Sequence, residues 1–191
     1  MSILRDGRGE AMGAPKITDK RWTIDLEKRI QESHYSDNPS RYSFDPNSDK
    51  ELFVIDTPPP YPSGTWHIGA VAQYSMIDVI ARSQRLIGKE VLFPWGVDRN
   101  GINIEFTVEK KTGKKMRTYD RGEFLDLCKE TIELYTQSMR RTAKRVGLSC
   151  DYDNEYLTDS PNYRSVTQSI FIDLFKKGDI IEDLRPNIYD P

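Results

Sequence analysis

Two short apolar runs stand out in the hydrophobic pattern: LFVID at residues 52–56 and EVLFP at residues 90–94. Both are rich in β-forming side chains and predict buried strands. Between them, helically spaced apolar residues predict a helix that opens near His67 and ends at Gly88. Strand, helix and strand form a βαβ unit, which implies an α/β fold with a parallel sheet. The expected inner face of the helix is Ile68, Val71, Ala72, Ser75, Met76, Val79 and Leu86.

The pattern predicts a helix before this unit and a long helix after it. Trp22, Leu26 and Ile30 recur every four residues and indicate a helix within residues 16–34. The long helix is expected to stop at Gly147, because glycine readily takes the left-handed conformation that ends helices. Its expected inner face is Phe124, Cys128, Ile132, Tyr135, Met139, Ala143 and Val146.

A last helix is predicted after residue 158. Asp159 or Ser160 suits its N-cap, Pro161 suits its first turn, and Gly178 suits its C-cap. An apolar stripe along this helix is expected to belong to the core rather than to a partner-binding groove. The stripe consists of Val166, Ile170 and Leu174.

The chain divides into three predicted regions. Residues 1–16 are rich in glycine, arginine and small side chains and are expected to be flexible. Residues 17–50 comprise the first helix and a polar loop with two prolines. Residues 51–191 comprise the α/β domain.

Composition and charge are those of a soluble globular protein. Of the 191 residues, 37% are hydrophobic and 30% are charged. The net charge of −2 exerts no general attraction on nucleic acid, so RNA contact would need a local cluster such as the basic run Lys110 to Arg117. A solvated helix face is the simpler interpretation of that run. No apolar run approaches the roughly 18 residues that cross a membrane, and no secretory signal opens the chain, so a cytoplasmic location is expected.

The two cysteines do not indicate a metal site. Cys128 and Cys150 form no CxxC pair and no ligand spacing with His34 or His67. We therefore expect both to be reduced and partly buried thiols.

The most informative stretch is IDTPPPYPSGTWHIGA, residues 55–70, which carries the chain from a strand into a helix. In open α/β sheets, ligands bind at the carboxyl ends of strands. A helix N-terminus offers free N–H groups and the positive end of a dipole, which attract phosphate. Gly64 and Gly69 allow a ligand to approach the backbone, and His67 can add a donor. These features favour a nucleotide site; the alternative is a structural turn in which His67 only caps the helix.

Three segments together resemble a known family. HIGA at residues 67–70 is similar to the HIGH motif of class I aminoacyl-tRNA synthetases. GVDRNGINIE at residues 96–105 resembles the GxDxxGxPxE segment of the valyl, isoleucyl and leucyl members. Residues 147–191 resemble the run into the family's connective insertion, and the likeness extends over residues 16–191. It implies the first half of a Rossmann-like catalytic domain, a parallel sheet with flanking helices.

The resemblance also implies a reaction and a set of site residues. ATP, accompanied by Mg2+, would activate an amino acid as its adenylate, and the acyl group would then move to tRNA. His67 would be the catalytic residue, donating a hydrogen bond to the phosphates as charge develops there. Asp98 would hold the α-ammonium group of the amino acid, although from local sequence it could instead form a turn with Asn100 and Gly101. The implied nucleotide-binding residues are Tyr61, Gly64, Thr65, His67, Gly69 and Ala70; the implied amino-acid-binding residues are Pro58, Pro59, Asp98 and Asn100.

The combination of PPPYPSG, HIGA and DRNGINIE points to the valyl branch found in archaea, which implies valine and tRNA(Val) as substrates. Isoleucyl members typically have glycine at the position matching Pro58, and a proline ring there would shorten the pocket. One methylene is worth about 1–3 kcal/mol of discrimination. Because PYPSG also occurs in leucyl members, isoleucyl and leucyl specificity remain alternatives.

Two positions depart from the family pattern. Ala70 stands where the motif has a second histidine, and Asp190 stands where members often carry a zinc-binding cysteine. The KMSKS loop, the editing domain and the anticodon-binding domain do not occur within these 191 residues, so the remainder of a synthetase polypeptide is an expected partner. Two alternatives stay open: a free-standing, catalytically silent relative that binds nucleotide or RNA, and another nucleotidyltransferase of the same superfamily.

Overall fold

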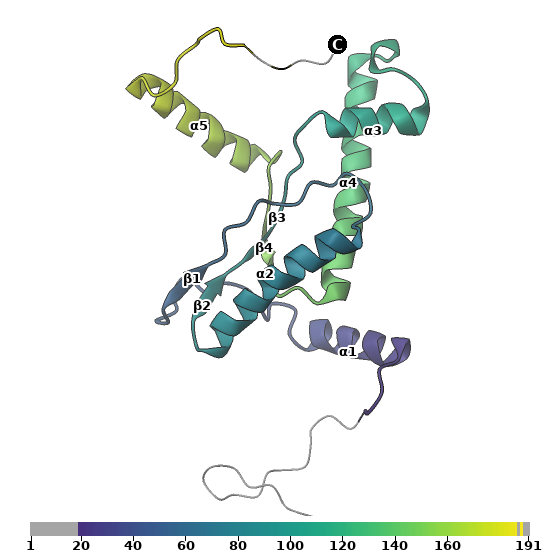
Figure 1. The fold of residues 1–191 in the computed structure, drawn as a ribbon, viewed down its shortest axis with the longest axis vertical. Helices are drawn as coiled ribbons and strands as arrows, with labels where there is room; N and C mark the ends of the chain where they lie inside the picture. The colour runs from purple at the N-terminus through teal and green to yellow at the C-terminus, as the bar shows by residue number, and fades with distance from the viewer. Residues whose placement is uncertain (1–18, 187, 189–191) are drawn as a thin grey trace, which may run out of the picture. The chain divides into compact units, whose positions relative to one another are not determined.

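The computed structural model describes residues 19–186 and 188, which fall into two compact units that divide between Pro39 and Ser40 (Figure 1). The expected flexibility of residues 1–16 therefore concerns residues outside the described range, as does Asp190.

The first unit contains one described helix, α1 (Ile24–Asp37). It begins where the Thr23 hydroxyl accepts a hydrogen bond from the amide of Leu26 at 3.1 Å. The helix predicted within residues 16–34 is present, but it starts and ends later. No residue of α1 is buried, and Trp22 and Ile30 are exposed, so the apolar stripe predicted there is not a core face.

The second unit contains two short parallel sheets. β1 (Leu52–Val54) pairs with β2 (Glu90–Leu92), and β3 (Pro94–Val97) pairs with β4 (Asp151–Leu157). Only Phe93 separates β2 from β3, and its carbonyl accepts a hydrogen bond from the first amide of β4 at 2.7 Å. One extended run therefore pairs with β1 along its first part and with β4 along its second part.

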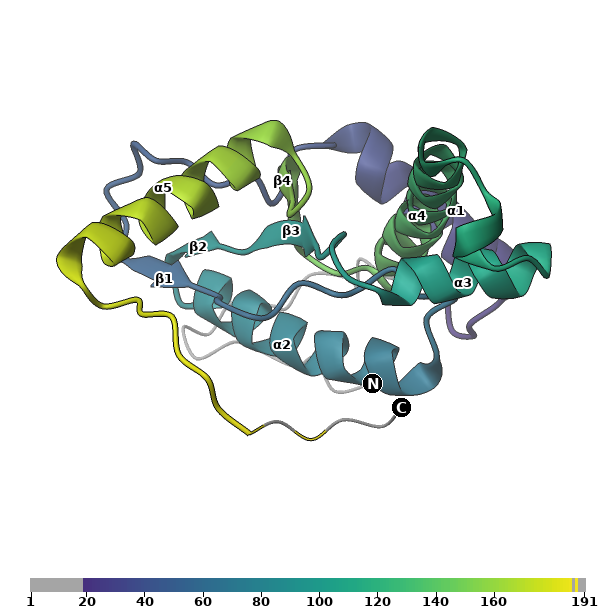
Figure 2. The ribbon, with the colours of Figure 1, turned by 90° about the horizontal axis from the view of Figure 1, so that it is seen from above.

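Helices connect these parallel strands. α2 (Ile68–Leu86) joins β1 to β2, which confirms the predicted βαβ unit. The crossover from β3 to β4 passes through α3 (Asn103–Thr112), the 3-10 helix η1 (Met116–Thr118) and α4 (Arg121–Val146). α5 (Pro161–Lys177) follows β4, and Figure 2 shows α2 and α5 on opposite sides of the strands. The fold is α/β with parallel strands and flanking helices, as predicted.

β4 was not predicted, because its sequence DYDNEYL is largely polar and its pairing is irregular. Pro94 lies opposite Asp151, whereas Gly96 lies opposite Tyr156, so β4 bulges between these positions. The buried Asp151 carboxylate holds the bulge by accepting hydrogen bonds from the amides of Asp153 at 3.0 Å and Asn154 at 3.1 Å. The polar segment can therefore pair with β3 while these two amides stay hydrogen-bonded.

Two clusters of buried side chains hold the second unit together. The larger one joins α2, the strands and the C-terminal half of α4, while the smaller one joins α3 to the N-terminal half of α4. Most of the predicted inner face of α4 is buried, but Val146 is exposed. The larger cluster contains Tyr74, Ala81, Val91, Phe93, Trp95, Val97, Met139, Ala143, Leu148 and Cys150; the smaller contains Ile104, Val108, Phe124, Cys128 and Ile132.

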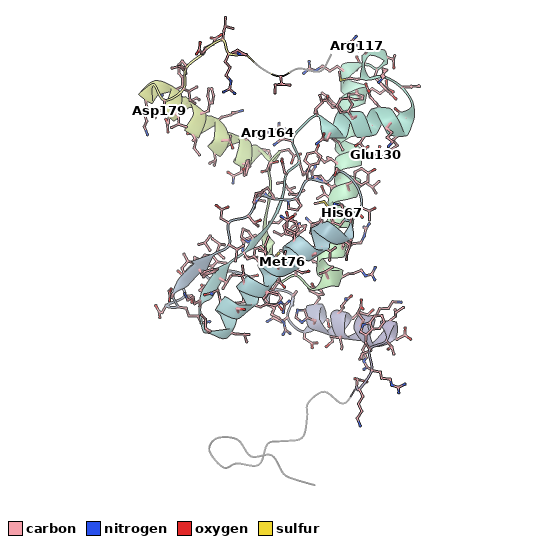
Figure 3. The ribbon with its side chains drawn as sticks, viewed as in Figure 1. His67, Met76, Arg117, Glu130, Arg164 and Asp179 are labelled. Carbon is pink, nitrogen blue, oxygen red and sulfur yellow. The ribbon has the colours of Figure 1, made fainter. Side chains whose placement is uncertain are left out.

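The inner face predicted for α2 is wrong. Tyr74, Asp78 and Ala81 are the buried residues of this helix. Asp78 can be buried because polar partners surround it. Its carboxylate accepts hydrogen bonds from the amide and the hydroxyl of Ser149 and from Arg82. The predicted face instead points to solvent, as Figure 3 shows for Met76. The exposed members are Ile68, Ala72, Met76, Val79 and Leu86.

Two further burial predictions are wrong. β1 was expected to be buried, yet Leu52 and Val54 are about half exposed, because among the described strands β1 has a neighbour only on the β2 side. α5 begins after its Ser160 cap and ends at Gly178, as predicted. Its apolar stripe is exposed, because no described residue covers that face; the stripe is Val166, Ile170 and Leu174.

Candidate functional site

The segment between β1 and α2 is held in place through its carbonyl and side-chain oxygens. Prolines have no N–H, so such a run cannot donate backbone hydrogen bonds and its carbonyls must find donors elsewhere. The hydroxyl of Tyr74 donates to the carbonyl of Pro58 at 3.0 Å, and the amide of Asp98 donates to the carbonyl of Pro60 at 3.0 Å. The hydroxyl of Tyr61 donates to the carbonyl of Gly101 at 3.3 Å. The Pro-rich turn is therefore fixed against α2 and against the residues after β3.

Aromatic rings pack beside this Pro-rich turn. Trp66 stacks on Tyr74 with ring centroids 5.0 Å apart and planes 11° apart, and Trp95 lies 5.9 Å from Trp66. Burial raises the pKa of Tyr74 to about 12. A small cavity of about 10 Å³ lies between the turn and the strands, with Pro59, Pro60 and Tyr156 among its lining residues. The turn thus rests on a rigid aromatic base.

His67 is the N-cap of α2, and its side chain is exposed at the start of the helix (Figure 3). Its Nδ1 accepts a hydrogen bond from the amide of Ala70 at 3.3 Å. A neutral imidazole that accepts at Nδ1 carries its proton on Nε2, so Nε2 is the available donor. Gly69 leaves the room that this geometry needs, because a Cβ there would lie 3.0 Å from the His67 Nδ1. The structure therefore aims one side-chain donor outward from a helix N-terminus.

Asp98 directly follows β3 and is half-buried. Its Oδ1 accepts a hydrogen bond from the amide of Asn100 at 3.1 Å, which forms the local turn considered from the sequence. The same oxygen accepts a second hydrogen bond, from the hydroxyl of Thr158 at 3.0 Å. Among the described residues, none donates a hydrogen bond to Oδ2. The protein thus fixes the Asp98 carboxylate through one of its two oxygens.

Arg99 anchors the same segment from the other side. Its side chain is only 10% exposed, and it forms ion pairs with Glu133 at 2.8 Å and with Asp159 at 3.1 Å. The contact between Nε and Asp159 is close enough for an ion pair but too poorly aligned for a hydrogen bond. The interaction with Arg99 also lowers the pKa of Glu133, after the larger effect of a hydrogen bond from Gln137. Residues after β3 are therefore tied to both α4 and the start of α5.

Tyr156 closes the site on the β4 side. A Cβ on Gly96 would lie 2.2 Å from Cζ of the Tyr156 ring, so only glycine permits the ring to cover the strand there. Burial raises the pKa of Tyr156, and the negative charges of Asp56 and Asp98 raise it further. The Tyr156 hydroxyl lies beside Gly96 of β3, because a Cβ on Gly96 would be 2.5 Å from it. Tyr156 also stacks on Tyr163 of α5 with ring centroids 6.0 Å apart.

The basic run singled out in the sequence lies elsewhere, at the end of α3 and in the loop after it. Lys115 pairs with Glu109 at 3.2 Å, and Lys110 and Lys114 are exposed. An open pocket of about 400 Å³ adjoins these side chains and Phe106. Solvated basic side chains account for this arrangement, and contact with RNA remains a hypothesis.

The described residues form no evident metal centre. Among the described residues, no three His, Cys, Asp or Glu side chains gather as metal ligands would. Cys128 and Cys150 are free and buried, as predicted for the thiols, and burial raises the pKa of both. Within the same part of the chain, no helix is long and apolar enough to cross a membrane.

The site residues predicted from the sequence fall into two groups. The structure joins Pro58, Tyr61 and Asp98 through hydrogen bonds between the Pro-rich turn, α2 and the residues after β3. It joins His67 to Ala70 at the helix start, while Thr65 is exposed and Gly64 takes φ +151° in the turn. Sequence reasoning missed Thr158 and Tyr156, because both follow the polar bulge that obscured β4. With β4 unpredicted, the sequence offered no signal for either residue.

Residues 31–191 match the family described as tRNA synthetases class I (I, L, M and V). The chain belongs to this family. The chain is 43% identical over 177 residues to the valine–tRNA ligase of Aeropyrum pernix. The matched stretch covers 90% of this chain and 21% of that protein. It is 45% identical over 150 residues to the valine–tRNA ligase of Archaeoglobus fulgidus, with 78% of this chain and 17% of that protein covered.

A solved structure shows the same fold. The leucyl-tRNA synthetase LeuRS agnB2 of Agrobacterium radiobacter K84, solved in a ternary complex with tRNA and LeuAMS, is similar to this class I synthetase chain with a TM-score of 0.64 and 30% identity. The match covers 80% of this chain and 17% of that one. The chain thus spans about a fifth of the length of the relatives that it matches.

Proposed function

We propose that this chain forms the first part of the adenylate-forming site of a valine–tRNA ligase. The observation that carries the proposal is the 43–45% identity to valine–tRNA ligases over most of the chain. The geometry supports it, because the hydrogen bond between Asp98 and Pro60 brings together two segments that resemble separate motifs of that family. Residues 51–191 would supply the first half of the catalytic domain, with residues 17–50 leading into it.

In this proposal, the N-terminus of α2 binds the phosphates of ATP. The free amides of the first helical turn and the Nε2 proton of His67 face the same negative charge. As pyrophosphate leaves, the charge on its oxygens grows, and a fixed donor stabilises that charge more than it stabilises the substrate. Tyr61, Gly64, Thr65, Gly69 and Ala70 would line the path of the nucleotide.

The amino acid would bind between the Pro-rich turn and the end of β3. The free Oδ2 of Asp98 is suited to the α-ammonium group, with Asn100 beside it. Pro58 and Pro59 would bound the side-chain pocket. The carboxylate of the bound amino acid then attacks the α-phosphorus of ATP in line. A new P–O bond forms as the bond to pyrophosphate breaks. The acyl group finally moves to the 3′ end of tRNA(Val), where an ester bond forms as the bond to phosphate breaks and AMP leaves.

Mg2+ would enter with the nucleotide. It prefers oxygen ligands and usually keeps several waters and substrate phosphates in its shell. The described residues offer no cluster that would hold the ion by themselves. The described residues fit a role in which they orient ATP, while the metal ion would screen the charge of the phosphates. The proposed location of the protein is the cytoplasm, where its tRNA substrate occurs.

Valine-dependent exchange of pyrophosphate into ATP tests the proposal. The protein is expressed from its whole reading frame and assayed with each of the twenty amino acids. Exchange with valine is expected, and so is transfer of valine to tRNA(Val). Exchange with leucine or isoleucine instead of valine would reassign the specificity within the family.

A catalytically silent relative is the second candidate, because Ala70 provides no side-chain donor at the helix start. That candidate predicts nucleotide binding by calorimetry without exchange for any amino acid. Substitution of Ala70 by histidine separates the two: a rise in an existing exchange rate is expected for the ligase, and no exchange for the silent relative.

A further inference from the structure

The hydroxyl of Thr158 connects three consecutive residues after β3. It accepts hydrogen bonds from the backbone amide of Arg99 at 2.8 Å and from Nδ2 of Asn100 at 2.9 Å, and it donates to Oδ1 of Asp98 at 3.0 Å. A threonine hydroxyl has one proton to donate and two lone pairs, so its whole hydrogen-bonding capacity is used. Thr158 is only 7% exposed, so water competes poorly for these bonds.

The main chain fixes the position of this hydroxyl. The amide of Thr158 donates to the carbonyl of Val97 at 3.2 Å, which continues the ladder between β3 and β4. The two ion pairs of Arg99 hold the neighbouring residue from the side of α4 and α5. Neither the acceptor Asp98 nor the donor Thr158 can therefore move far without breaking other contacts.

We propose that Thr158 is a positioning residue that holds the Asp98 carboxylate with Oδ1 engaged and Oδ2 directed to the amine of the substrate. The inference rests on the proposed function, in which Asp98 binds the α-ammonium group. Thr158 orients an acidic group through a single neutral hydroxyl, which leaves the negative charge of Asp98 unpaired within the described residues and available to a cationic ligand. Serine could replace it, because it has the same hydroxyl; valine could not, because it has the same shape without one.

The test uses ATP–pyrophosphate exchange by the protein expressed from its whole reading frame. In Thr158→Val, the KM for valine is expected to rise about tenfold or more, as for loss of one hydrogen bond to a charged group. The KM for ATP should change little. Thr158→Ser should restore the wild-type value. Thr136→Val is the matched control, because Thr136 is also buried but its hydroxyl donates to the carbonyl of Ile132 within α4.

A second measurement separates orientation of Asp98 from a general loss of structure. Binding of a nonhydrolysable valyl-adenylate analogue is compared with binding of the same analogue without its amine. The Thr158→Val variant should lose affinity only for the analogue with the amine, whereas a structural defect would weaken both. If valine at this position prevents folding, Thr158→Ala takes its place in both assays.

The outcomes distinguish this inference from the proposed function. Valine-dependent exchange in the wild type with an unchanged KM in Thr158→Val would overturn the role of Thr158 alone. An equal loss of affinity for both analogues would overturn it too. Absence of valine-dependent exchange in the wild type would overturn the proposed function and this role with it.

Discussion

The backbone amide of Asp98 donates a hydrogen bond to the carbonyl oxygen of Pro60 at 3.0 Å. This bond joins the turn after β1 to the end of β3, which lie far apart in the sequence. β1 is parallel to β2, and β3 continues the run of β2, so the two segments meet at the carboxyl ends of parallel strands, where α/β proteins bind their ligands. The hydrogen bond brings two sequence motifs together.

Substitution of His67 should separate helix capping from catalysis. Asparagine is a good N-cap but is too short to reach outward as Nε2 does. His67→Asn is therefore expected to lower the exchange rate about 100-fold, with little change in thermal stability. His67→Ala should lose the cap too, which costs about 1 kcal/mol.

The control for these variants is Met76→Ala, on the exposed face of the same helix (Figure 3). It should keep both rate and stability. Full exchange activity in His67→Asn would show that the imidazole only caps α2.

Pro58 should set the length of the amino-acid pocket. Pro58→Gly keeps the carbonyl that accepts the hydrogen bond from Tyr74, but it removes the ring. The preference for valine over isoleucine, measured as the ratio of kcat/KM values in exchange, is expected to fall by roughly 10-fold or more. The KM for ATP serves as the internal control. An unchanged ratio would place the specificity-determining contact elsewhere.

The buried phenol of Tyr74 should make stability depend on alkaline pH. Burial raises its pKa to about 12 in the folded chain, whereas a tyrosine in the unfolded chain titrates near its ordinary 10.0. The folded state therefore keeps its proton longer, and the free energy of unfolding falls as the pH rises from 10 toward 12. The whole effect is about 2 kcal/mol.

Chemical denaturation between pH 9 and pH 12 measures this slope. Tyr74→Phe should remove a part of it, while Tyr61, Tyr156, Cys128 and Cys150, whose pKa values burial also raises, keep the rest. Tyr163→Phe, at an exposed position on α5, is the control and should retain most of the slope, because Tyr163 acts only by raising the pKa of Tyr156. A slope unchanged by Tyr74→Phe would contradict the assignment.

The exposed apolar face of α5 should make the 191-residue chain prone to association. Phe171 and Phe175 are more than half exposed, and so are Val166 and Ile170. When purified alone, the chain is expected to bind a hydrophobic dye and to form soluble aggregates.

Charged substitutions test which face is responsible. Phe171→Lys combined with Phe175→Lys should reduce dye binding, whereas Gln168→Glu on the same helix should not. A sharp, reversible and monomeric unfolding transition of the unsubstituted chain would contradict the prediction.

Periodic patterns were sufficient for helices whose ends are marked by local chemistry. Gly147 and Gly178 end α4 and α5 in the left-handed conformation, and Ser160 caps α5, all as the sequence indicates. These features depend on neighbouring residues only, so they can be predicted without the fold. The fold class could be predicted from the order of these elements, and the family from short motifs. Both can be recognised in contiguous stretches of the sequence.

Which face of an element is buried depends on what lies opposite, and apolar spacing alone does not reveal it. α2 buries Asp78 because Ser149 and Arg82 supply its hydrogen bonds. The spacing of apolar residues could not predict the burial of an acidic side chain. β4 was missed because Asp151 satisfies the amides of a polar bulge.

By itself, the sequence determined that a Pro-rich turn and a capped helix lead out of a parallel strand, because turn chemistry and caps are local. Only the tertiary structure decided that Thr158 contacts Asp98 and that Tyr156 covers Gly96. Those contacts join residues distant in the chain. Their physical cause is the pairing of β3 with β4, whose register is set by an irregular bulge that no pattern in the sequence records.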